Sequence, residues 1–510
     1  MQVNTTVIFH ISEVETKSDD ELQNLINKFN SIYHSSHLIA IADANPISLS
    51  AKFDEILTII SAKNATFPEQ WNSALSKVHT ETVLYIDNRH APVIPADSVL
   101  NIFHLAKERN DNAGMIYGDY SINTDDEEQE IHLLPHHPGR LRDNQDYGKM
   151  FYFDTAAVKK IGGMDIDLAY NHLYDLRLKL AEQTELIRVA NKYSGSLYTV
   201  YSGKDKANVF DYLLAGKEQQ LEAENTLTNH LERIGAKLYP NQGFKTAPKG
   251  DFSLTASVII PVNNRPEFIG TAIESVQNQS ISEIEVLVVV NGGKDDPTIP
   301  AVKEYLSGGN KYDSNKPEVR LLITDINNIG FCLNYGATNA NGKYYVQLDS
   351  DDRLKANAVE SIVKVFDSDP TVGMVIGSYD VWEKKGSGEL VRMDEIPVVT
   401  HDEWTDDNGR NNLLRINGAG APRSIPIALI KSIGWFGIND DPYALNYGED
   451  YDMVLRISEQ YKIGRIYSPI YEVIRHSGGT DHAINQAVVD RNDEAKDWMR
   501  LEALQRRQNA

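Results

Sequence analysis

The most chemically suggestive residues of this sequence are the clustered carboxylates of Leu348-Asp-Ser-Asp-Asp352. They come directly after Tyr344–Leu348, a short apolar segment that is typical of a buried strand. Carboxylates packed this closely repel one another, so a purely structural role explains them poorly. A divalent cation would neutralise them and would also bridge a diphosphate, whose oxygens suit a hard metal. An isolated Asp-x-Asp is a weak indication of such a site, because acidic turns are common.

Two further segments carry polar residues at the ends of predicted elements. Tyr447-Gly-Glu-Asp-Tyr-Asp-Met-Val-Leu-Arg456 has the pattern of a helix that begins with acidic residues. Taken alone, it is explained by compensation of the helix dipole and by an Asp452–Arg456 ion pair one turn apart. Tyr471-Glu-Val-Ile-Arg-His476 predicts a strand that ends in a histidine, and Ser477–Gly479 predicts a flexible turn. Gly478 and Gly479 in that turn could hinge a loop that closes over a ligand.

A third segment, Gly418-Ala-Gly-Ala-Pro-Arg423, superficially looks like the glycine-rich turn of a dinucleotide-binding unit. It lacks the third glycine and the strand-turn-helix setting, and Pro422 interrupts the start of any following helix. We therefore assign no nucleotide-binding role to this segment.

The elements that position these residues alternate between strands and helices. The pattern predicts strands at Ala256–Val262, Ile284–Val290, Val319–Thr324 and Tyr344–Leu348. It also predicts helices at Pro266–Asn278 and before the last of these strands, and a glycine-rich turn at Asn291–Asp296. Such alternation indicates an α/β fold with a mostly parallel sheet, in which ligands bind at the carboxyl ends of the strands.

Four motifs of this region occur in an order that is typical of one family. They are Ser257-Val-Ile-Ile-Pro-Val-Asn-Asn-Arg-Pro266, Val290-Asn-Gly-Gly293, Asn328-Ile-Gly-Phe-Cys-Leu-Asn-Tyr-Gly336 and Asp349–Asp352. Together they resemble the family 2 glycosyltransferases of the GT-A fold, over about Thr255 to His482. The resemblance implies an inverting transfer of a hexosyl or deoxyhexosyl group from a UDP-, dTDP- or GDP-linked sugar, with manganese or magnesium as the cofactor. The acceptor would be a hydroxyl group of a saccharide, lipid-linked or protein-linked molecule.

The same resemblance implies roles for individual residues. Asp351, His476 and Asp349 would bind the metal, and the donor would contact Pro261, Val262, Asn263, Asn291, Asn334, Asp349 and Ser350. Asp450 would be the base that takes the proton of the acceptor hydroxyl, while Glu449 would orient the acceptor. Trp435 would form an aromatic wall for the acceptor sugar, with a place in the core as the alternative. The family usually has an acidic residue where Asn291 stands, which leaves open which nucleobase is bound.

The first half of the chain repeats the second half in the same order. Thr82–Ile86 followed by Asp87 matches Tyr344–Leu348 followed by Asp349. Three further pairs match at nearly constant spacing: Gly114–Tyr120 with Gly373–Tyr379, Val158–Gly162 with Ile430–Gly434, and Tyr174–Leu178 with Tyr451–Leu455. We interpret these matches as a diverged duplication. The predicted fold class is therefore two tandem GT-A, mostly parallel α/β domains plus a C-terminal helix.

The first copy lacks the residues that this chemistry would need. Asp87-Asn-Arg89 puts a guanidinium where the metal would bind, and His172-Leu173 replaces the Glu-Asp pair. We expect residues 1–237 to form a degenerate, non-catalytic domain that ends in a helix from Lys206 to Ile234. A linker at 238–254, a catalytic domain at 255–482 and a helical segment at 483–510 would follow. This layout resembles bacterial transferases that build surface polysaccharides such as O-antigen.

The composition is that of a globular protein and excludes several classes. Of 510 residues, 41% are hydrophobic, and the formal net charge of −23 disfavours nucleic acid as a partner. Cys332 is the single cysteine, which excludes an intrachain disulfide and a cysteine-built zinc site. Residues 1–14 lack the pattern of a signal peptide, and every apolar run is far shorter than the ~20 residues of a membrane helix. We expect a cytoplasmic protein, with peripheral contact at the inner membrane face and homo-oligomerisation left open.

Two alternatives to a glycosyltransferase stay open at this point. A nucleotidyltransferase also combines a metal-binding aspartate with a parallel sheet, but it would need a basic loop near the first strand, where the chain offers only Arg265. A non-enzymatic carbohydrate-binding scaffold would require both copies to be inactive, and Asp351 and Asp450 argue against that.

Overall fold

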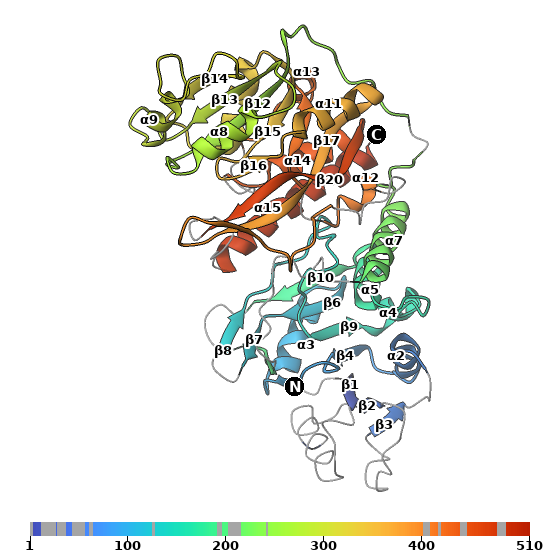
Figure 1. The fold of residues 1–510 in the computed structure, drawn as a ribbon. Helices are drawn as coiled ribbons and strands as arrows, with labels where there is room; N and C mark the ends of the chain where they lie inside the picture. Colours follow the sequence, from blue (N-terminus) through green and yellow to red (C-terminus); the bar gives the residue numbers. More distant parts are fainter. Residues whose placement is uncertain are drawn as a thin grey trace. The chain divides into compact units, whose positions relative to one another are not determined.

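The computed structural model falls into two compact units, Met1–Ile234 and Gly235–Ala510 (Figure 1). It describes residues 4–11, 27, 37–42, 57–60, 65–124, 128–190, 196–201, 216–240, 243–400, 409–416, 420–438, 446–476 and 486–509.

The first unit is built on a twisted, mostly parallel sheet. Its strands lie in the order β10 (Glu185–Val189), β6 (Ala113–Gly118), β9 (Met150–Asp154), β4 (Thr82–Ile86), β1 (Thr5–Ile11), β2 (His37–Ala42) and β3 (Leu57–Ile60). Only β9 runs antiparallel to its neighbours. A smaller sheet contains β5 (Val93–Pro95), β11 (Tyr198–Tyr201), β7 (Tyr120–Asn123) and β8 (Glu128–Ile131). The strands β1 and β4 are buried along their whole length, which explains their uninterrupted apolar and β-branched sequences.

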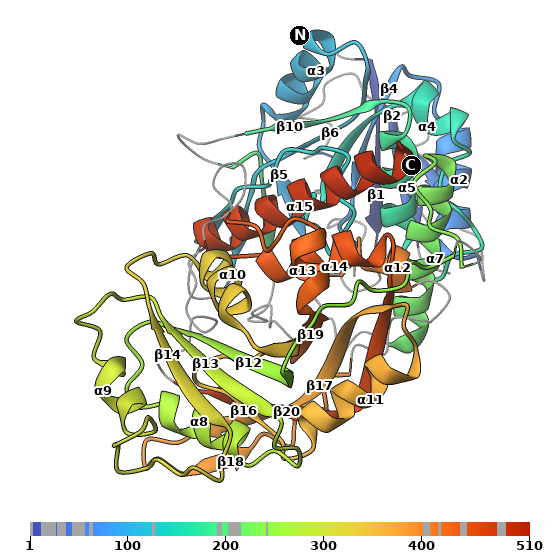
Figure 2. The ribbon, with the colours of Figure 1, turned by 90° about the horizontal axis from the view of Figure 1, so that it is seen from above.

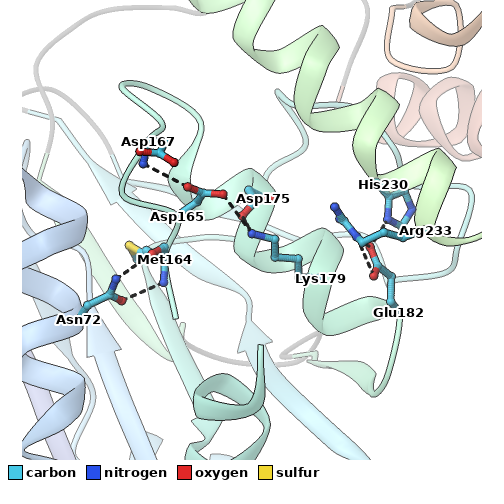
Figure 3. Close-up of polar contacts among 9 residues, drawn as sticks. All are labelled: Asn72, Met164, Asp165, Asp167, Asp175, Lys179, Glu182, His230 and Arg233. Atoms are coloured by element: carbon cyan, nitrogen blue, oxygen red, sulfur yellow. Dashed lines mark hydrogen bonds and ion pairs between the residues drawn. The ribbon is translucent and has the colours of Figure 1, made fainter. Parts of the chain in front are cut away.

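Five helices accompany these strands in the described part of the first unit. They are α2 (Phe67–Ser76), α3 (Val99–Arg109), α4 (Thr155–Lys160), α5 (His172–Ala181) and α7 (Lys217–Arg233). The long helix α7 packs against α5, and their ends are joined by the Glu182 carboxylate, which accepts from His230 Nδ1 at 2.7 Å and Arg233 Nε at 2.8 Å (Figure 3). The helix predicted from Lys206 therefore begins at Lys217 in the described chain, while residues 202–215 lie outside the described residues.

The second unit contains a larger sheet. Its strands lie in the order β14 (Glu318–Ile323), β13 (Ile284–Val290), β12 (Leu254–Val262), β15 (Gly342–Gln347), β19 (Arg423–Pro426), β17 (Val372–Lys384), β20 (Lys462–Arg475) and β16 (Arg353–Leu354), with β18 (Leu390–Arg392) paired to β17. The four strands predicted from the sequence are β12, β13, β14 and β15, and they are parallel to one another.

Helices cover both faces of this sheet (Figure 2). One face carries α8 (Ile269–Gln277), α9 (Thr298–Lys303) and α11 (Ala358–Ser368), and the other carries α10 (Ile329–Asn339), α13 (Ile427–Ser432) and α14 (Glu449–Ser458). The short α12 (Gly409–Asn412) and the C-terminal α15 (Gln486–Gln508) complete the unit. Helix α15 buries Ala495, Met499, Ala503 and Leu504, and it packs on α14. The predicted α/β class and C-terminal helix are confirmed.

The two sheets share one topology. The order β3-β2-β1-β4-β9-β6-β10 in the first unit corresponds to β14-β13-β12-β15-β19-β17-β20 in the second. Within these seven corresponding strands, the one antiparallel strand, β9 or β19, occupies the same place in both. A side-chain hydrogen bond is also repeated: Tyr174 Oη donates to the Leu141 carbonyl in the first unit, and Tyr451 Oη donates to the Leu413 carbonyl in the second, each at 2.6 Å. The duplication inferred from the sequence is therefore also present in the folded chain.

The chain between the two units runs without helix or strand over the described residues of 235–253. It is held to the second unit by backbone hydrogen bonds from Lys245 N to the Gln460 carbonyl and from Ala247 N to the Pro370 carbonyl, both 2.9 Å long. This segment therefore belongs structurally to the second unit.

Candidate active site

The acidic turn follows β15 and connects it to β16, at the carboxyl end of the parallel strands. Its last carboxylate, Asp352, points inward, where Oδ2 accepts from Tyr471 Oη at 2.8 Å and Oδ1 from Ile474 N at 2.8 Å. The amide of Asp349 donates to the same Tyr471 hydroxyl at 3.1 Å. Asp352 and Tyr471 therefore tie the turn to β20, so Asp352 shapes the site and does not line it.

Asp351 points the other way, toward the predicted histidine. His476 Nε2 lies 3.0 Å from Asp351 Oδ2, and the imidazole stacks on Phe268 with ring centroids 4.3 Å apart. The side chain of Asp351 is 25% exposed and that of His476 is 7% exposed. Fold topology thus brings together two residues that are 125 positions apart in the chain. The turn with Gly478 and Gly479 lies outside the described residues.

Asp349 lies deeper than Asp351. Burial raises the pKa of Asp349, and the nearby Asp351 carboxylate adds to the rise, while Arg423 opposes it. The Gln347 amide donates to Asp349 Oδ1 at 3.3 Å. Within the described part of the chain, no three histidine, cysteine or carboxylate side chains form a ready metal-binding group. The oxygen and imidazole atoms of Asp351 and His476 nevertheless suit Mn²⁺ or Mg²⁺, and a cation would relieve the repulsion that acts on Asp349.

The second acidic pair opens helix α14. Gly448 adopts the left-handed conformation with φ of 84°, which turns the chain so that Glu449 and Asp450 form the first turn of the helix. Burial alone would raise the pKa of Asp450, but Arg423, followed by Lys496, outweighs burial and lowers it. Burial and the adjacent Asp450 raise the pKa of Glu449 to about 8. The surroundings of the pair therefore favour the ionised form of the aspartate and the protonated form of the glutamate. The predicted Asp452–Arg456 ion pair is present, at 2.7 Å.

Arg423 on β19 is the residue of this site that the sequence analysis missed. Its Nη2 lies 2.6 Å from Asp450 Oδ2, and its Nε is buried without a hydrogen-bond partner in the described chain. The duplication supplies the signal that could have identified it. In the second unit Ser424 pairs with Val346, and in the first unit Tyr152 pairs with Leu84, which is the equivalent of Val346. The residue before each of these, Arg423 in the second unit and Phe151 in the first, is therefore also equivalent. The arginine is thus confined to the copy that keeps the carboxylates.

Asn334 on α10 is hydrogen-bonded to the loop that follows α13. Its Oδ1 accepts from Phe436 N and its Nδ2 donates to the Phe436 carbonyl, both at 2.9 Å. Asn72 of the first unit makes the same two hydrogen bonds to Met164, at 2.9 and 2.7 Å (Figure 3). Because this clamp is kept in the copy without carboxylates, we assign it to holding the loop after α13. The predicted contact of Asn334 with the donor stays a prediction, because these two hydrogen bonds do not test it.

The remaining predicted donor residues lie at the ends of neighbouring strands. Pro261 and Val262 close β12, and Asn291 N donates to the Val262 carbonyl at 3.0 Å. Asn291 is buried, while Asn263 is exposed beside it. Ser350 is buried within the acidic turn. These residues form the edge of the sheet next to Asp349, which is where a ligand of a parallel sheet binds.

The equivalent site of the first unit is closed by an internal ion pair. Arg89 Nε and Nη2 lie 2.7 and 3.1 Å from the two Asp87 oxygens, and the guanidinium covers the Phe67 ring at 3.7 Å. His172 and Leu173 occupy the positions of Glu449 and Asp450 at the start of α5. Among the described residues at this place, a cation replaces the carboxylate of Asp351 and a leucine replaces the carboxylate of Asp450.

Comparison with known proteins identifies the domain that carries the acidic turn. Residues 257–415 match the sequence model of the family described as glycosyl transferase family 2. This part of the chain is a family 2 glycosyltransferase domain. The family 2 domain contains Asp349, Asp351 and the strands β12 to β15, while α14 and β20 follow it in the second unit.

Relatives of the chain include polymer synthases and uncharacterised glycosyltransferases. The chondroitin synthase of Escherichia coli is 33% identical over 224 residues, which are 44% of this chain and 29% of that protein. The hyaluronan synthase of Pasteurella multocida is 27% identical and matches over 44% of this chain and 21% of that protein. An uncharacterised glycosyltransferase of Rickettsia prowazekii is 28% identical over 46% of this chain and 69% of that protein. The chain therefore spans only a fifth to a third of the length of these two synthases.

Solved structures also match the chain. Staphylococcus aureus TarS in complex with UDP-GlcNAc has 18% identity and a TM-score of 0.35, over 46% of this chain and 62% of that one. A Pyrobaculum calidifontis mannosyltransferase with GDP-Man and Mn²⁺ has 14% identity and a TM-score of 0.33, over 57% of this chain and 82% of that one.

Among the described residues, no helix combines the length and apolar character needed to cross a bilayer.

Proposed function

We propose that the second unit is an inverting, metal-dependent glycosyltransferase. It moves a hexosyl or deoxyhexosyl group from a UDP-, dTDP- or GDP-linked donor to a hydroxyl group of a saccharide, lipid-linked or protein-linked acceptor. The observation that best supports this proposal is that one partly buried arginine links the two carboxylate groups. Arg423 is ion-paired with Asp450 and acts electrostatically on Asp349. Donor-side and base-side carboxylates thus meet at one end of one sheet.

Asp351 and His476 would hold the divalent cation, with Asp349 next to them. When bound, the cation offsets the charge that develops on the departing nucleoside diphosphate. Gln347 and Tyr471 hold Asp349 and its backbone in place. Pro261, Val262, Asn263, Asn291 and Ser350 are the proposed contacts of the nucleoside and diphosphate.

Asp450 is the proposed base. The acceptor oxygen forms a bond to the anomeric carbon while the bond from that carbon to the diphosphate oxygen breaks, and the acceptor proton passes to Asp450. Arg423 favours the ionised form that can accept this proton. The raised pKa of Glu449 favours its protonated form, which can donate a hydrogen bond to the acceptor and so orient it. Trp435 is the proposed aromatic contact of the acceptor.

The first unit is proposed to be non-catalytic, because Arg89 and Leu173 stand where a metal ligand and the base would be needed. We place the protein in polysaccharide or glycoconjugate synthesis at the cytoplasmic side of the membrane, where lipid-linked acceptors are available. Nucleotidyl transfer would need a basic loop beside β12 that binds a triphosphate. Among the described residues of that loop, Arg265 is the single cation, so the loop does not favour this alternative.

The test compares two aspartates of α14. Asp450→Asn removes the proton acceptor but keeps size, so the rate should fall by about 10²–10⁴ while donor affinity hardly changes. Asp452→Asn, two residues along, removes only an ion pair with Arg456 and should stay within a few-fold of wild type. The measurement is sugar transfer and hydrolysis on a panel of nucleotide sugars, including UDP-GlcNAc and GDP-mannose, with manganese. Equal activity of Asp450→Asn and wild type would remove Asp450 from the mechanism.

A further inference from the structure

A cavity of about 380 Å³ lies between α10 and the loop that follows α13 in the second unit. Its walls include Phe331, Tyr335, Thr338, Trp435, Phe436 and Ile438. Phe331 and Tyr335 stack one helical turn apart with ring centroids 5.9 Å apart, and Ile438 is exposed at the rim. None of the residues found to line the cavity carries a charge. The volume falls within the range of small-ligand pockets.

The frame of this cavity is the same in both copies of the fold. Asn334 clamps Phe436 as Asn72 clamps Met164, which places α10 and α2 at equivalent positions beside equivalent loops. Figure 3 shows the Asn72–Met164 clamp of the first unit. The loops also share their backbone conformation. Gly434 and Gly162 have φ values of 93° and 88°, and the next residue is left-handed in both copies.

The side chains that line the cavity are not the same. Counting from the clamp, Glu69 and Ser73 of the first unit stand where Phe331 and Tyr335 stand in the second. Gly163 stands where Trp435 stands, with φ of 77° against 69°. A bulky residue adopts this conformation at a cost that glycine avoids. Three aromatic residues, one of them in a strained conformation, are therefore present only in the copy that keeps the catalytic carboxylates. Strain of this kind persists where a function requires it.

The cavity is also tied to the helix of the proposed base. The Trp435 carbonyl accepts from Arg456 Nη2 of α14 at 2.7 Å. On the other wall, the amide of Ile329 at the start of α10 donates to Asn446 Oδ1 at 2.8 Å, three residues before Glu449. Both walls are thus hydrogen-bonded to α14 or to the residues just before it, which is the segment that carries Asp450.

From these observations, we propose that this cavity is a subsite for an uncharged sugar ring of the acceptor chain, separate from the ring that is glycosylated. This inference rests on the proposed function of the second unit. Aromatic rings present flat apolar faces that can pack on the C–H face of a sugar, and Tyr335 adds a hydroxyl group for hydrogen bonding. A lining without charge matches a neutral ring and offers nothing to a carboxylate or phosphate. Binding here would hold a longer acceptor against the enzyme between transfers.

The experiment uses the whole chain and exchanges cavity residues for those of its own first copy. Tyr335→Ser and Trp435→Gly, alone and together, introduce residue types that the same frame already accommodates in the first unit, and glycine suits the left-handed position. Tyr467→Ser is the matched control, because this tyrosine of β20 is 49% exposed and does not line the cavity. Thermal unfolding of each variant checks that the fold is retained.

Binding is measured on an array of immobilised, uncharged oligosaccharides of three or more units. We expect wild type and Tyr467→Ser to bind at least one such chain, and the double variant to bind it at least tenfold more weakly. Equal binding by the double variant, or no binding by wild type, would overturn the subsite. A wild-type dimer in sedimentation that the double variant loses would also overturn it, by assigning the cavity to a second copy. Hydrolysis of nucleotide sugars by wild type is measured separately, so that failure of the proposed function is distinguished from failure of the subsite.

Discussion

Arg423 Nη2 lies 2.6 Å from Asp450 Oδ2, so the proposed base is ion-paired with a residue from an antiparallel strand that is inserted into an otherwise parallel part of the sheet. The first copy has phenylalanine at the same place and leucine in place of the aspartate. The arginine and the carboxylate are thus present or absent together, which points to a shared task.

The first prediction concerns that ion pair. Arg423→Met removes the charge that lowers the pKa of Asp450, so the carboxylate should be protonated up to a higher pH. The acid limb of the pH profile of kcat/KM should therefore move to higher pH, with a rate loss of about tenfold or more at neutral pH. Arg423→Lys keeps the charge, so the acid limb of its pH profile should lie close to that of wild type. An acid limb that does not move in Arg423→Met would show that Asp450 is not the titrating base.

The acidic turn allows two neighbouring carboxylates to be separated by their roles. Asp351→Asn should weaken manganese and donor binding but leave the melting temperature of the metal-free protein nearly unchanged, because Asp351 is partly exposed. Asp352→Asn should instead lower the melting temperature, since the carboxylate is buried between Tyr471 Oη and Ile474 N. Calorimetric titration with manganese and thermal unfolding in chelator measure the two effects. Full activity in chelator would exclude the metal, and the reverse pattern would exchange the roles of the two aspartates.

Glu449 should make the stability of the protein depend on pH. Its pKa in the folded chain is raised from 4.5 to about 8, so the folded state binds more protons than the unfolded state between these values. The contribution of Glu449 to the free energy of unfolding should therefore fall as the pH rises from about 4.5 to 8. Glu449→Gln should flatten the dependence in urea unfolding measured at several pH values. A slope that is unchanged in Glu449→Gln would assign the effect to other groups.

The first unit should be silent in catalysis. Asp87→Asn removes the carboxylate that pairs with Arg89 and accepts from Tyr85 Oη in that unit, and it should leave turnover unchanged. Titration with a nucleotide sugar and manganese should give one donor site per chain in wild type. Arg89→Asp should not create a second site, because Leu173 still stands where the base would be. Two donor sites per chain, one of them lost in Asp87→Asn, would make the enzyme a two-site polymerase.

Several features of the molecule were determined by the sequence alone. The strands β12 to β15 and the turn at Asp349–Asp352 could be predicted, because their apolar runs and polar ends are local patterns that reflect burial in a parallel sheet. The duplication could be predicted for a related reason: the repeated motifs lie in the strands β4 and β6, at the end of α4 and within α5, all of which have equivalents in the second unit.

Only the tertiary structure decided which polar residues meet. The pairs Arg423–Asp450 and Asp351–His476 join strands, turns and helices that are far apart in the chain, and no local pattern encodes a contact between them. The difference between Asp351 and Asp352 depends on which side chain the turn directs toward Tyr471. Asn334 lies in a motif that resembles a donor site, yet its amide is engaged by the backbone of Phe436. A residue type states what a side chain can bond to, whereas the packing of β19, β20 and α10 determines which partner lies within reach.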